Sequence, residues 1–594
     1  MPEHNFDLVI LEDVKNVTIN KDCSFTRHII QRIKILTQKG MTAFSDQRFW
    51  YNTRSQDVEV LKAQTVTQDG RVIPITPHAV TDLLPPAFAR APGLCHVQEK
   101  LVCLIGLEIN AVTELELKIA DKSPRPFFAG EELVGTYFPA VKKEFSVTVP
   151  EDMQFSHSYR NGVSGISAQP EISSAAGMKT FKWSFNNVPA LLEAENAPSR
   201  QELASVIAFA ANPQNVAGAF AGRIGGSLAR TSKQLKAKVK ELTAGKKGVL
   251  DKVHAVYGYV QKSLNHIDIS ASVAMETAVC IPRAVEEIFM THYANPVEKS
   301  VLLYAMLKTA GVKSEIAFGT DTEFTNPALP AQFNKCGVIV TLNKKPVWLD
   351  TTYDFSKAKN TRPTGDIAVL KKNGVRILPA QAVAAQDNTA EVRVNFAIDK
   401  DYIMAGTADF RFTGYFNPFW SFESGEKAIR DFVRQKLDAF GGKAEIKSLK
   451  IKGVSYPVMS AQARFEIADC FGDNAPEKQK QNALNLPRFT FDLPEWLIVT
   501  GREVPVKIFG PCRIKETFVI SGPALRGRKA FIPAQREIDT DTGAFTGKGS
   551  YKSGRAVYVC ALEMKEAVVP SARAEQAKAL IDAYNENRNI VLCE

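Results

Sequence analysis

The sequence predicts an α+β multidomain protein in which a β-sandwich-like N-terminal domain and a β-rich C-terminal domain flank a core of helices and strands. Three observations support this fold class. Residues 5–190 contain short runs of alternating apolar and polar side chains, which are typical of half-buried strands. Helical periodicity dominates residues 200–265, and one further helix and three short strands follow it. Strand-like segments then return over residues 385–594.

The length of the chain agrees with this division. A chain of 594 residues is expected to hold about three or four domains. We therefore expect an N-terminal domain over residues 1–190, a core over residues 200–375 and a C-terminal domain over residues 385–594. A proline-containing segment, residues 187–200, would link the first two domains.

The N-terminal domain is predicted from its strands and from one turn. Alternation is visible in residues 24–35 and 112–119. Asp69 and Gly70 stand between two β-prone runs, a pair that favours a tight hairpin turn. These strands predict an antiparallel sandwich with a polar outer face. Further strands are expected over residues 145–149 and 181–185.

The helical region that follows is rich in lysine and arginine. Its ordinary interpretation is a solvated helix face whose long side chains cover apolar surface. The alternative is a patch for a polyanion or an anionic lipid surface. The glycines of residues 217–228 weaken the helix prediction for that stretch. The basic residues are Arg223, Arg230, Lys233, Lys236, Lys238, Lys240, Lys246, Lys247 and Lys252.

One helix of the core has a well-marked start. Asn295 is a favoured N-cap residue. Pro296 suits the first helical position because its φ is already helical and its missing N–H would be unpaired there. The apolar residues that follow predict a buried helix that ends at Gly311. Strands are expected next over residues 314–318, 336–342 and 346–349.

Three segments of the core resemble motifs of one protein family. Residues 292–308, HYANPVEKSVLLYAMLK, resemble the segment in which a cysteine opens a buried helix in transglutaminase-like proteins. Residues 333–338, FNKCGV, resemble a strand that carries a histidine, and residues 346–354, PVWLDTTYD, resemble a strand end that carries an aspartate. Weaker likenesses in the order of the family extend over residues 32–40, 60–73, 106–117, 250–264 and 502–506.

On these motifs the chain is identified as a member of the bacterial transglutaminase-like superfamily, with an N-terminal β-rich domain of unknown function and a β-rich C-terminal domain. The resemblance implies a papain-like core and a degenerate catalytic triad. Pro296 stands where the family has its cysteine nucleophile, Lys335 where it has its histidine base, and Asp350 where it has its orienting carboxylate. Proline offers no acid, base or nucleophile, and a protonated lysine cannot accept a proton from a thiol.

Two further expectations follow from the exchanged residues. Because an unpaired buried carboxylate is costly, we expect Lys335 and Asp350 to form an ion pair across the old site. All eight histidines lie at or before His292, so none follows Lys335 to restore the family's order of residues.

The alternative to an inactive protein is a transamidase or cysteine peptidase that uses a relocated thiol, Cys336 or Cys280. Lys335 could lower the pKa of the neighbouring Cys336. Adjacent residues of a strand point to opposite faces, however, so a buried structural thiol is favoured. His292 lies four residues before Pro296, but a base there still lacks a nucleophile. His254 and His266 are interpreted as ordinary residues of a helix and its end.

Other conspicuous segments have plainer interpretations. Residues 222–226 contain three glycines but lack the strand-then-helix setting of a phosphate loop. Residues 539–543 lack the further ligands of a calcium loop, so a polar turn is favoured. A cluster of aromatic residues is attributed to packing, with an exposed carbohydrate platform as the alternative. Its members are Phe416, Phe419, Trp420 and Phe422.

Composition limits the function further. A formal charge of +10 over 594 residues is weak support for a polyanion, so no nucleic acid partner is expected. The nine cysteines show no paired or zinc-like spacing, so no metal or other cofactor is expected. No run of about 18 apolar residues predicts a membrane span. The chain starts without a visible signal peptide, although the resemblance favours a periplasmic or extracellular location.

The sequence therefore predicts a catalytically inactive transglutaminase-like protein. Such a protein would act as a binding or scaffolding module for a polypeptide or a cell-envelope component. A purely structural multidomain protein is a third interpretation. Neither the ligand nor the oligomeric state follows from the sequence.

Overall fold

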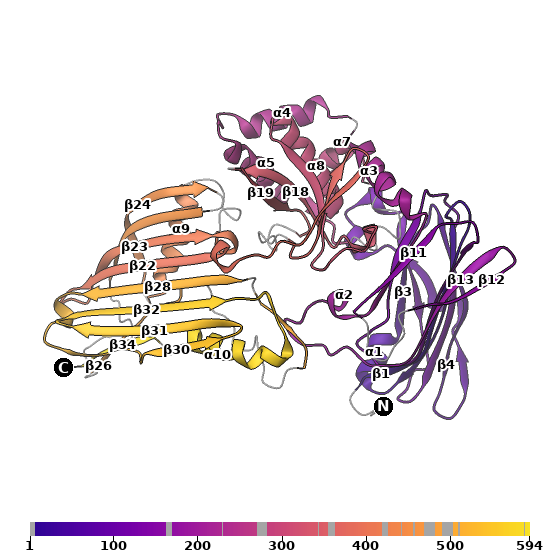
Figure 1. Ribbon diagram of the computed structural model, residues 1–594, viewed down its shortest axis with the longest axis horizontal. Helices are drawn as coiled ribbons and strands as arrows, with labels where there is room; N and C mark the ends of the chain where they lie inside the picture. The colour runs from indigo at the N-terminus through magenta and orange to yellow at the C-terminus, as the bar shows by residue number, and fades with distance from the viewer. Residues whose placement is uncertain are drawn as a thin grey trace. The chain divides into compact units, whose positions relative to one another are not determined.

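The computed structural model describes residues 6–161, 169–228, 230–269, 282–342, 344–353, 363–417, 426–440, 442–455, 458–468, 481–489, 503–508, 511–586 and 588–593. The chain divides into two compact units (Figure 1). One consists of Met1–Glu193, Ser199–Lys246 and Tyr259–Gln381, and the other of Ala194–Pro198, Lys247–Gly258 and Ala382–Glu594. The protein is multidomain and strand-rich. Its division into three domains stays a prediction, because the N-terminal strands and the core fall within one unit.

The N-terminal part of the first unit is β-rich, as predicted. Its main sheet has eight strands in the order β12-β13-β10-β1-β2-β8-β4-β5. Neighbouring strands are antiparallel except β1 and β10, which are parallel. In chain order the strands are β1 (Leu8–Ile19), β2 (Phe25–Ile35), β4 (Gln56–Val66), β5 (Val72–Pro74), β8 (Val112–Asp121), β10 (Ala140–Pro150), β12 (Glu171–Ala175) and β13 (Met178–Val188).

A second layer packs against this sheet. Its three strands are β9 (Phe128–Leu133), β11 (Phe155–Arg160) and β14 (Val206–Ala211). The two layers share one apolar cluster, in which the rings of Phe145 and Phe209 lie 5.3 Å apart. A further small sheet is made of β3 (Asp46–Asn52), β6 (Val80–Leu83) and β7 (Val97–Cys103), and two short helices are α1 (Gln38–Phe44) and α2 (Arg200–Leu203).

The turn predicted at Asp69 and Gly70 is present. It joins β4 to β5, which pair as an antiparallel hairpin with Val66 opposite Val72. Gly70 has a φ of 84°, a conformation that glycine adopts without a steric penalty. This turn could be predicted from the sequence because a tight turn depends only on the few residues that form it.

The core is an antiparallel sheet with a buried helix packed on it. The sheet runs in the order β19-β18-β17-β20-β21, and helix α8 (Pro296–Thr309) contacts β17 and β18. Helices α4 (Lys233–Thr243) and α7 (Val285–Thr291) contact α8, and α3 (Val216–Ser227) contacts β21. The strands are β17 (Ser314–Gly319), β18 (Lys335–Leu342), β19 (Lys345–Asp350), β20 (Ile367–Lys371) and β21 (Gly374–Leu378). Helix α5 is Val249–Ser263, and a two-stranded ladder joins β15 (Asn265–His266) to β16 (Tyr293–Ala294).

Helix α3 forms in spite of the glycines that weakened its prediction. Its apolar side buries Phe220 and Ile224. The ring of Phe220 lies 5.0 Å from Phe318 and 5.3 Å from Phe333. Burial of apolar surface thus overrides the low helix propensity of glycine, which costs only about 1 kcal/mol at each position.

The basic region includes helix α4, whose two sides differ. Leu235 and Val239 are buried, whereas Lys233, Lys236 and Lys240 are exposed. This arrangement fits a solvated helix face.

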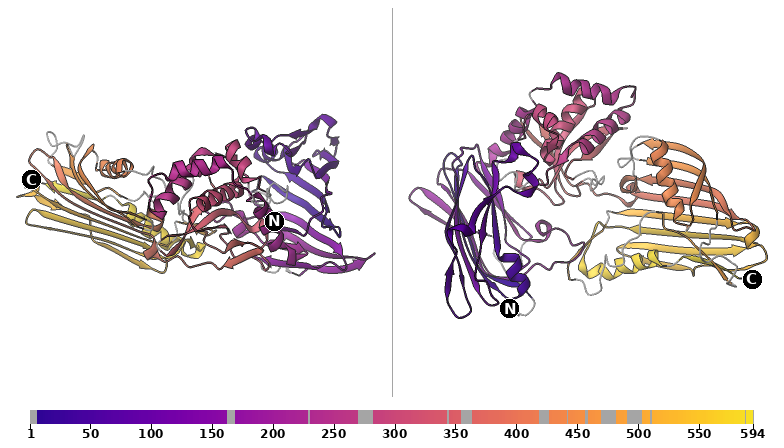
Figure 2. Two further views of the ribbon diagram at one scale, coloured as in Figure 1. Left: turned by 90° about the horizontal axis from the view of Figure 1, so that it is seen from above. Right: turned by 180° about the vertical axis from the view of Figure 1, so that it is seen from behind.

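The second unit is built on another eight-stranded sheet, in the order β24-β25-β23-β22-β28-β32-β31-β30. Helices α9 (Glu426–Asp438) and α10 (Ala574–Asn585) lie on the same face of it (Figure 2, right) and share its apolar core. The strands are β22 (Thr389–Ile398), β23 (Met404–Thr413), β24 (Ala444–Ser455), β25 (Val458–Ile467), β28 (Cys512–Ser521), β30 (Arg536–Thr540), β31 (Gly543–Lys552) and β32 (Arg555–Met564). Short strands are β26 (Gln481–Asn485), β27 (Val506–Lys507), β29 (Lys529–Phe531), β33 (Val568–Val569) and β34 (Asn589–Cys593).

Two segments that were interpreted from the sequence, residues 539–543 and the aromatic cluster that includes Phe416, belong to this unit. Asp539 lies on β30, and the turn after that strand leads into β31 at Gly543, as a polar hairpin turn would. Phe416 is partly buried and packs against the core of the unit. The other three aromatic residues of its cluster, Phe419, Trp420 and Phe422, lie outside the described residues.

Candidate functional site

The first residue of helix α8 is Pro296, and its start is stabilised as the sequence predicted. The side chain of Asn295 accepts a hydrogen bond from the Glu298 N–H at 2.9 Å, and Glu298 accepts one from the Asn295 N–H at 3.2 Å. This reciprocal pair is a capping box. Arg283 donates two hydrogen bonds to the Glu298 carboxylate, at 2.7 and 3.0 Å, and fixes it further. The cap therefore holds Pro296 rigidly at a buried helix N-terminus.

The carbonyl of Pro296 connects the helix to the end of β19. The hydroxyls of Ser300 and Thr351 each lie 3.2 Å from this carbonyl oxygen and 2.6 Å from one another. Because each hydroxyl has one hydrogen, one of them donates to the carbonyl and the other donates either to the carbonyl or to its neighbour. Thr351 directly follows Asp350. The start of α8 and the residue after Asp350 are thus joined by a buried cluster of hydrogen bonds.

Strand β18 begins with Lys335, and its start lies beside the end of β19. Asp350 lies opposite Gly337 in the β18–β19 ladder. The Thr351 N–H donates to the Cys336 carbonyl at 3.0 Å, and the Thr352 hydroxyl bonds the Cys336 backbone. Lys335, one residue before Cys336, is 8% exposed. Pro296, Lys335 and Asp350 therefore come from three elements that meet at one end of the sheet.

The predicted ion pair between Lys335 and Asp350 is wrong. The ammonium of Lys335 lies 2.5 Å from a carboxylate oxygen of Asp321, which also accepts hydrogen bonds from the N–H and hydroxyl of Thr364. Asp321 follows β17, and it was not singled out from the sequence. The carboxylate of Asp321, from the segment after β17, thus pairs with the ammonium of Lys335. The charge of Lys335 acts on Asp350 only from a greater distance.

Asp350 is fully buried, and this decides its acid–base behaviour. Burial raises the pKa of Asp350 to about 6, although hydrogen bonds from Thr352 and the charges of Lys335 and Lys299 oppose that rise. One of those bonds is the 2.7 Å contact from the Thr352 N–H to Oδ1. The carboxylate of Asp350 thus bonds to the backbone of its own strand end.

Lys299 is a buried polar residue that sequence reasoning missed as part of the site. It is 0% exposed, and its ammonium donates to the Gln261 side chain at 2.6 Å and to the Tyr353 carbonyl at 2.9 Å. Gln261 in turn donates to the Asp350 carbonyl. Lys299 lies in the first turn of α8 between Glu298 and Ser300, so its immediate neighbours in the sequence did not mark it as buried.

Cys336 lies next to Lys335 on β18 and is a buried thiol. Cys336 is 1% exposed, and burial raises the pKa of its thiol far above the usual range, with the Asp350 charge adding to the rise. Among the seven described cysteines none is hydrogen-bonded to a histidine. Cys280 lies outside the described residues.

Three histidines were considered as candidates from the sequence. His292 is exposed and ends α7 in a left-handed conformation with a φ of 56°. Its carbonyl accepts a hydrogen bond from the Asn265 N–H at 2.8 Å. His266 lies opposite Ala294 in the short parallel ladder, and His254 is buried on α5. No group of three His, Cys, Asp or Glu side chains in the described part of the chain could hold a metal ion.

Comparisons with known proteins agree with this geometry at the level of fold. Residues 21–191 match a family model described as a domain of unknown function with a solved structure, DUF3857. A crystal structure of a "putative protease" from Parabacteroides distasonis ATCC 8503 matches with a TM-score of 0.71 and 16% identity and covers 99% of both chains. At that identity the match shows a shared fold over the full length and no more. A search of curated proteins found no match.

Two other solved structures match only in part. A "putative cysteine protease" from Cytophaga hutchinsonii has 10% identity over 43% of this chain and 83% of its own, with a TM-score of 0.18. The M1 zinc metallopeptidase from Deinococcus radiodurans has 13% identity over 34% of this chain and 42% of its own, with a TM-score of 0.19. Neither likeness carries an argument at such TM-scores. No helix within the described ranges is both long and apolar enough to cross a membrane.

Proposed function

We propose that the chain is a catalytically inactive transglutaminase-like protein that binds a polypeptide, or another component, at the bacterial envelope. One observation carries the proposal. The first position of buried helix α8, where the resembled family has its nucleophile, is Pro296, and its carbonyl is engaged by Ser300 and Thr351. A proline at this place serves the helix and provides no reactive group.

The electrostatics of the neighbouring residues support the proposal. Lys335, at the position of the resembled family's histidine, is held in an ion pair with Asp321. Asp350 has no imidazole to orient at that position, and Cys336 is held in its neutral form by burial. An acyl transfer needs a thiolate and a base within hydrogen-bond reach, and these residues supply neither.

The full-length likeness to a protein named as a protease supports an origin in amide chemistry. A helix on an antiparallel sheet, with the three positions meeting at one end, is what a papain-like core requires. A fold that once held an extended polypeptide can keep that binding surface after its chemistry is lost, because function depends on the site rather than on the fold.

Restoring the lost groups tests the ancestry and the inactivity together. The double variant Pro296→Cys with Lys335→His is expected to gain amidase or transamidase activity toward a casein substrate. The matched control is Pro296→Ala with Lys335→His, which has the same loss of proline and lysine without the thiol. Turnover by the unmodified protein would contradict the proposed inactivity, and equal turnover by both double variants would contradict the proposed position of the nucleophile.

Thiol labelling separates an inactive protein from an enzyme with a relocated cysteine. We expect iodoacetamide to label the exposed Cys95 first and Cys336 only after unfolding. Mass spectrometry of tryptic peptides gives the order. Fast, pH-dependent labelling of Cys336 or Cys280, together with amide turnover that the corresponding Cys→Ser variant abolishes, would favour the enzyme.

The binding part of the proposal has its own measurement. Unfolded casein is titrated into the protein, and amide hydrogen exchange reports which backbone segments become protected. We expect protection of the segments around Asn295 and Thr351. An absence of any protection at saturating casein would contradict polypeptide binding and leave the inactivity unaffected.

A further inference from the structure

A hollow lined by arginine and aromatic side chains lies between the N-terminal strands and the core, within the first unit. Its cavity volume is about 50 Å³, and it opens to solvent. The N-terminal strands contribute Phe25 and Arg27 from β2 and Trp50 from β3. The core contributes Arg223 from α3 and Pro330 from a short 3₁₀ turn. The candidate site around Pro296 uses none of these residues.

The two walls of the hollow are held together by polar contacts. Glu131 on β9 accepts a hydrogen bond from Gln332 of the 3₁₀ turn at 3.0 Å. Arg160 of β11, which forms a 2.6 Å ion pair with Glu131, donates a 3.1 Å hydrogen bond to the Thr322 hydroxyl of the core. The hollow is therefore part of the packed unit, and its shape is set before any ligand arrives.

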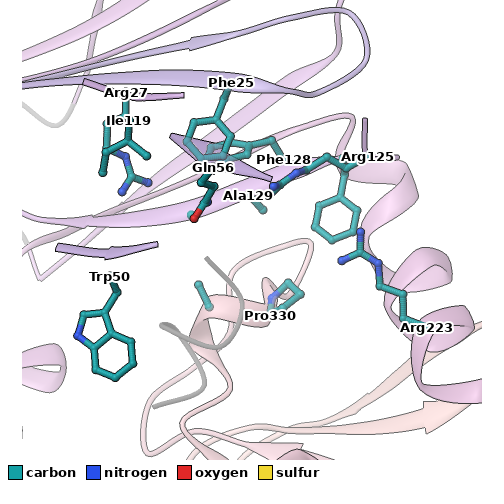
Figure 3. A pocket seen from close by; sticks show the side chains of 13 residues that line it. Phe25, Arg27, Trp50, Gln56, Ile119, Arg125, Phe128, Ala129, Arg223 and Pro330 are labelled. Atoms are coloured by element: carbon teal, nitrogen blue, oxygen red, sulfur yellow. The ribbon is translucent and has the colours of Figure 1, made fainter. Parts of the chain in front are cut away.

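Three guanidinium groups face the hollow from two sides. Figure 3 shows Arg27 on one side, Arg125 and Arg223 on the other, and Gln56 between them. Each cation lies near an aromatic ring: Arg27 and Arg125 lie 5.8 and 5.3 Å from the centroid of Phe25, and Arg223 lies 5.9 Å from that of Phe127. Such contacts orient a guanidinium without neutralising its charge.

The charges of Arg125 and Arg223 are compensated to different degrees. Arg125 is paired with the buried carboxylate of Asp121, which also accepts a 3.0 Å hydrogen bond from Gln56. Arg223 forms no ion pair within the described part of the chain. A guanidinium has five N–H donors, so the bond to Asp121 leaves donors of Arg125 available. The hollow thus offers an uncompensated cation beside a second, pre-oriented one.

We propose that this hollow binds an organic carboxylate that carries an apolar or aromatic group. The carboxylate lies between Arg223 and Arg125, where planar guanidinium groups match its geometry with charge-assisted hydrogen bonds. The apolar group lies against Phe128 and Trp50, which line the same hollow. Apolar walls with a few convergent polar groups are typical of small-molecule sites. This site is independent of the proposed function, because it requires nothing of Pro296 or Lys335.

The test compares two probes that differ in one charge. N-acetyl-phenylalanine and its amide are each titrated into the full-length protein, and calorimetry gives the dissociation constants. We expect the acid to bind and the amide to bind at least about tenfold more weakly, since a hydrogen bond to a charged group contributes about 1.5–3 kcal/mol. Equal binding of acid and amide, or no binding of either, would overturn the proposal.

Variants locate the binding in the hollow. Arg223→Gln is expected to weaken binding of the acid about tenfold or more. Arg230→Gln is the matched control, because Arg230 is exposed, lies shortly after the same helix and does not line the hollow. Ala331→Phe fills the hollow without changing any charge and is expected to abolish binding. Unchanged binding in Ala331→Phe, or equal losses in the two arginine variants, would place the ligand elsewhere and refute the site.

A longer probe distinguishes the two sources of such a carboxylate. An unstructured decapeptide ending in phenylalanine is used with a free or an amidated C-terminus. Tighter binding of the free-acid peptide than of N-acetyl-phenylalanine identifies the C-terminus of a polypeptide as the ligand. Equal affinities identify the isolated carboxylate as sufficient. Both results support the site, whereas equal binding of the two peptide forms contradicts it.

Discussion

The ammonium of Lys335 lies 2.5 Å from the carboxylate of Asp321, and the two side chains are only 10% and 9% exposed. This pair joins the start of β18 to the segment that follows β17. Lys335 is thus held by a structural contact that does not involve Asp350.

Removing Lys335 is therefore expected to destabilise the first unit. Lys335→Met leaves Asp321 buried without its cation and should lower the free energy of unfolding by about 3 kcal/mol. Thermal unfolding followed by circular dichroism measures the shift. Lys122→Met is the control, because the Lys122–Asp57 pair is 77% and 71% exposed and should contribute less than about 1 kcal/mol. Equal shifts in the two variants would show that the Lys335 pair is not buried in solution.

The buried carboxylate of Asp350 predicts a pH-dependent stability. Its pKa in the folded protein is about 6, against 3.8 when exposed. Between these values the folded state holds a proton that the unfolded state has lost, so stability falls as the pH rises through this window. Asp350→Asn removes that loss and should stabilise the protein at about pH 7 by up to about 3 kcal/mol, while the two proteins converge near pH 4.

The measurement for Asp350 is a series of melting curves between about pH 4 and pH 8. Asp57→Asn, at an exposed carboxylate of the same unit, is the control and should show no such convergence. A difference between Asp350→Asn and the unmodified protein that does not change with pH would disprove the raised pKa.

Substitutions of two adjacent residues at the start of helix α8 should lower the free energy of unfolding by unequal amounts. Asn295→Ala removes the cap and should cost about 1–2 kcal/mol. Pro296→Ala keeps a good helix former at the first position and should cost less than about 1 kcal/mol. Urea unfolding compares them. Ser232→Ala, which removes the N-cap of α4, is a reference for a surface cap. A larger loss from Pro296→Ala than from Asn295→Ala would mean that the proline has a role beyond starting the helix.

The second unit has a buried ion pair of its own. Arg588 donates to Glu516 and, at 2.9 Å, to the Tyr584 carbonyl, and the two charged side chains are 3% and 0% exposed. Arg588→Met should destabilise the unit by about 3–5 kcal/mol, because it leaves the buried carboxyl group of Glu516 without this cationic partner. Arg513→Met is the control, because the Arg513–Glu563 pair joins β28 to β32 but is 50% and 31% exposed. Thermal melting of the full chain should show a lowered transition for Arg588→Met alone.

Much of the fold followed from local sequence patterns. Alternation predicted the strand that became β8, in which buried and less buried residues alternate. The residues Asn295 and Pro296 fixed the start of α8, and Gly311 marked its end, because caps and turns depend on a few neighbouring residues. The candidate site positions Pro296, Lys335 and Asp350 were proposed from a family resemblance carried by short segments of the core, and their assignment stays a prediction.

Tertiary structure alone decided the partners. Asp321 rather than Asp350 forms the ion pair with Lys335. The side chain of Gln261 accepts a hydrogen bond from the buried ammonium of Lys299. Helix α3 forms in spite of its glycines because Phe220 packs on Phe318. The arginines of the hollow likewise come from segments far apart in the chain. Periodicity and capping are encoded between neighbours in the sequence, whereas ion pairs, burial and pKa shifts depend on which distant segments converge when the chain packs.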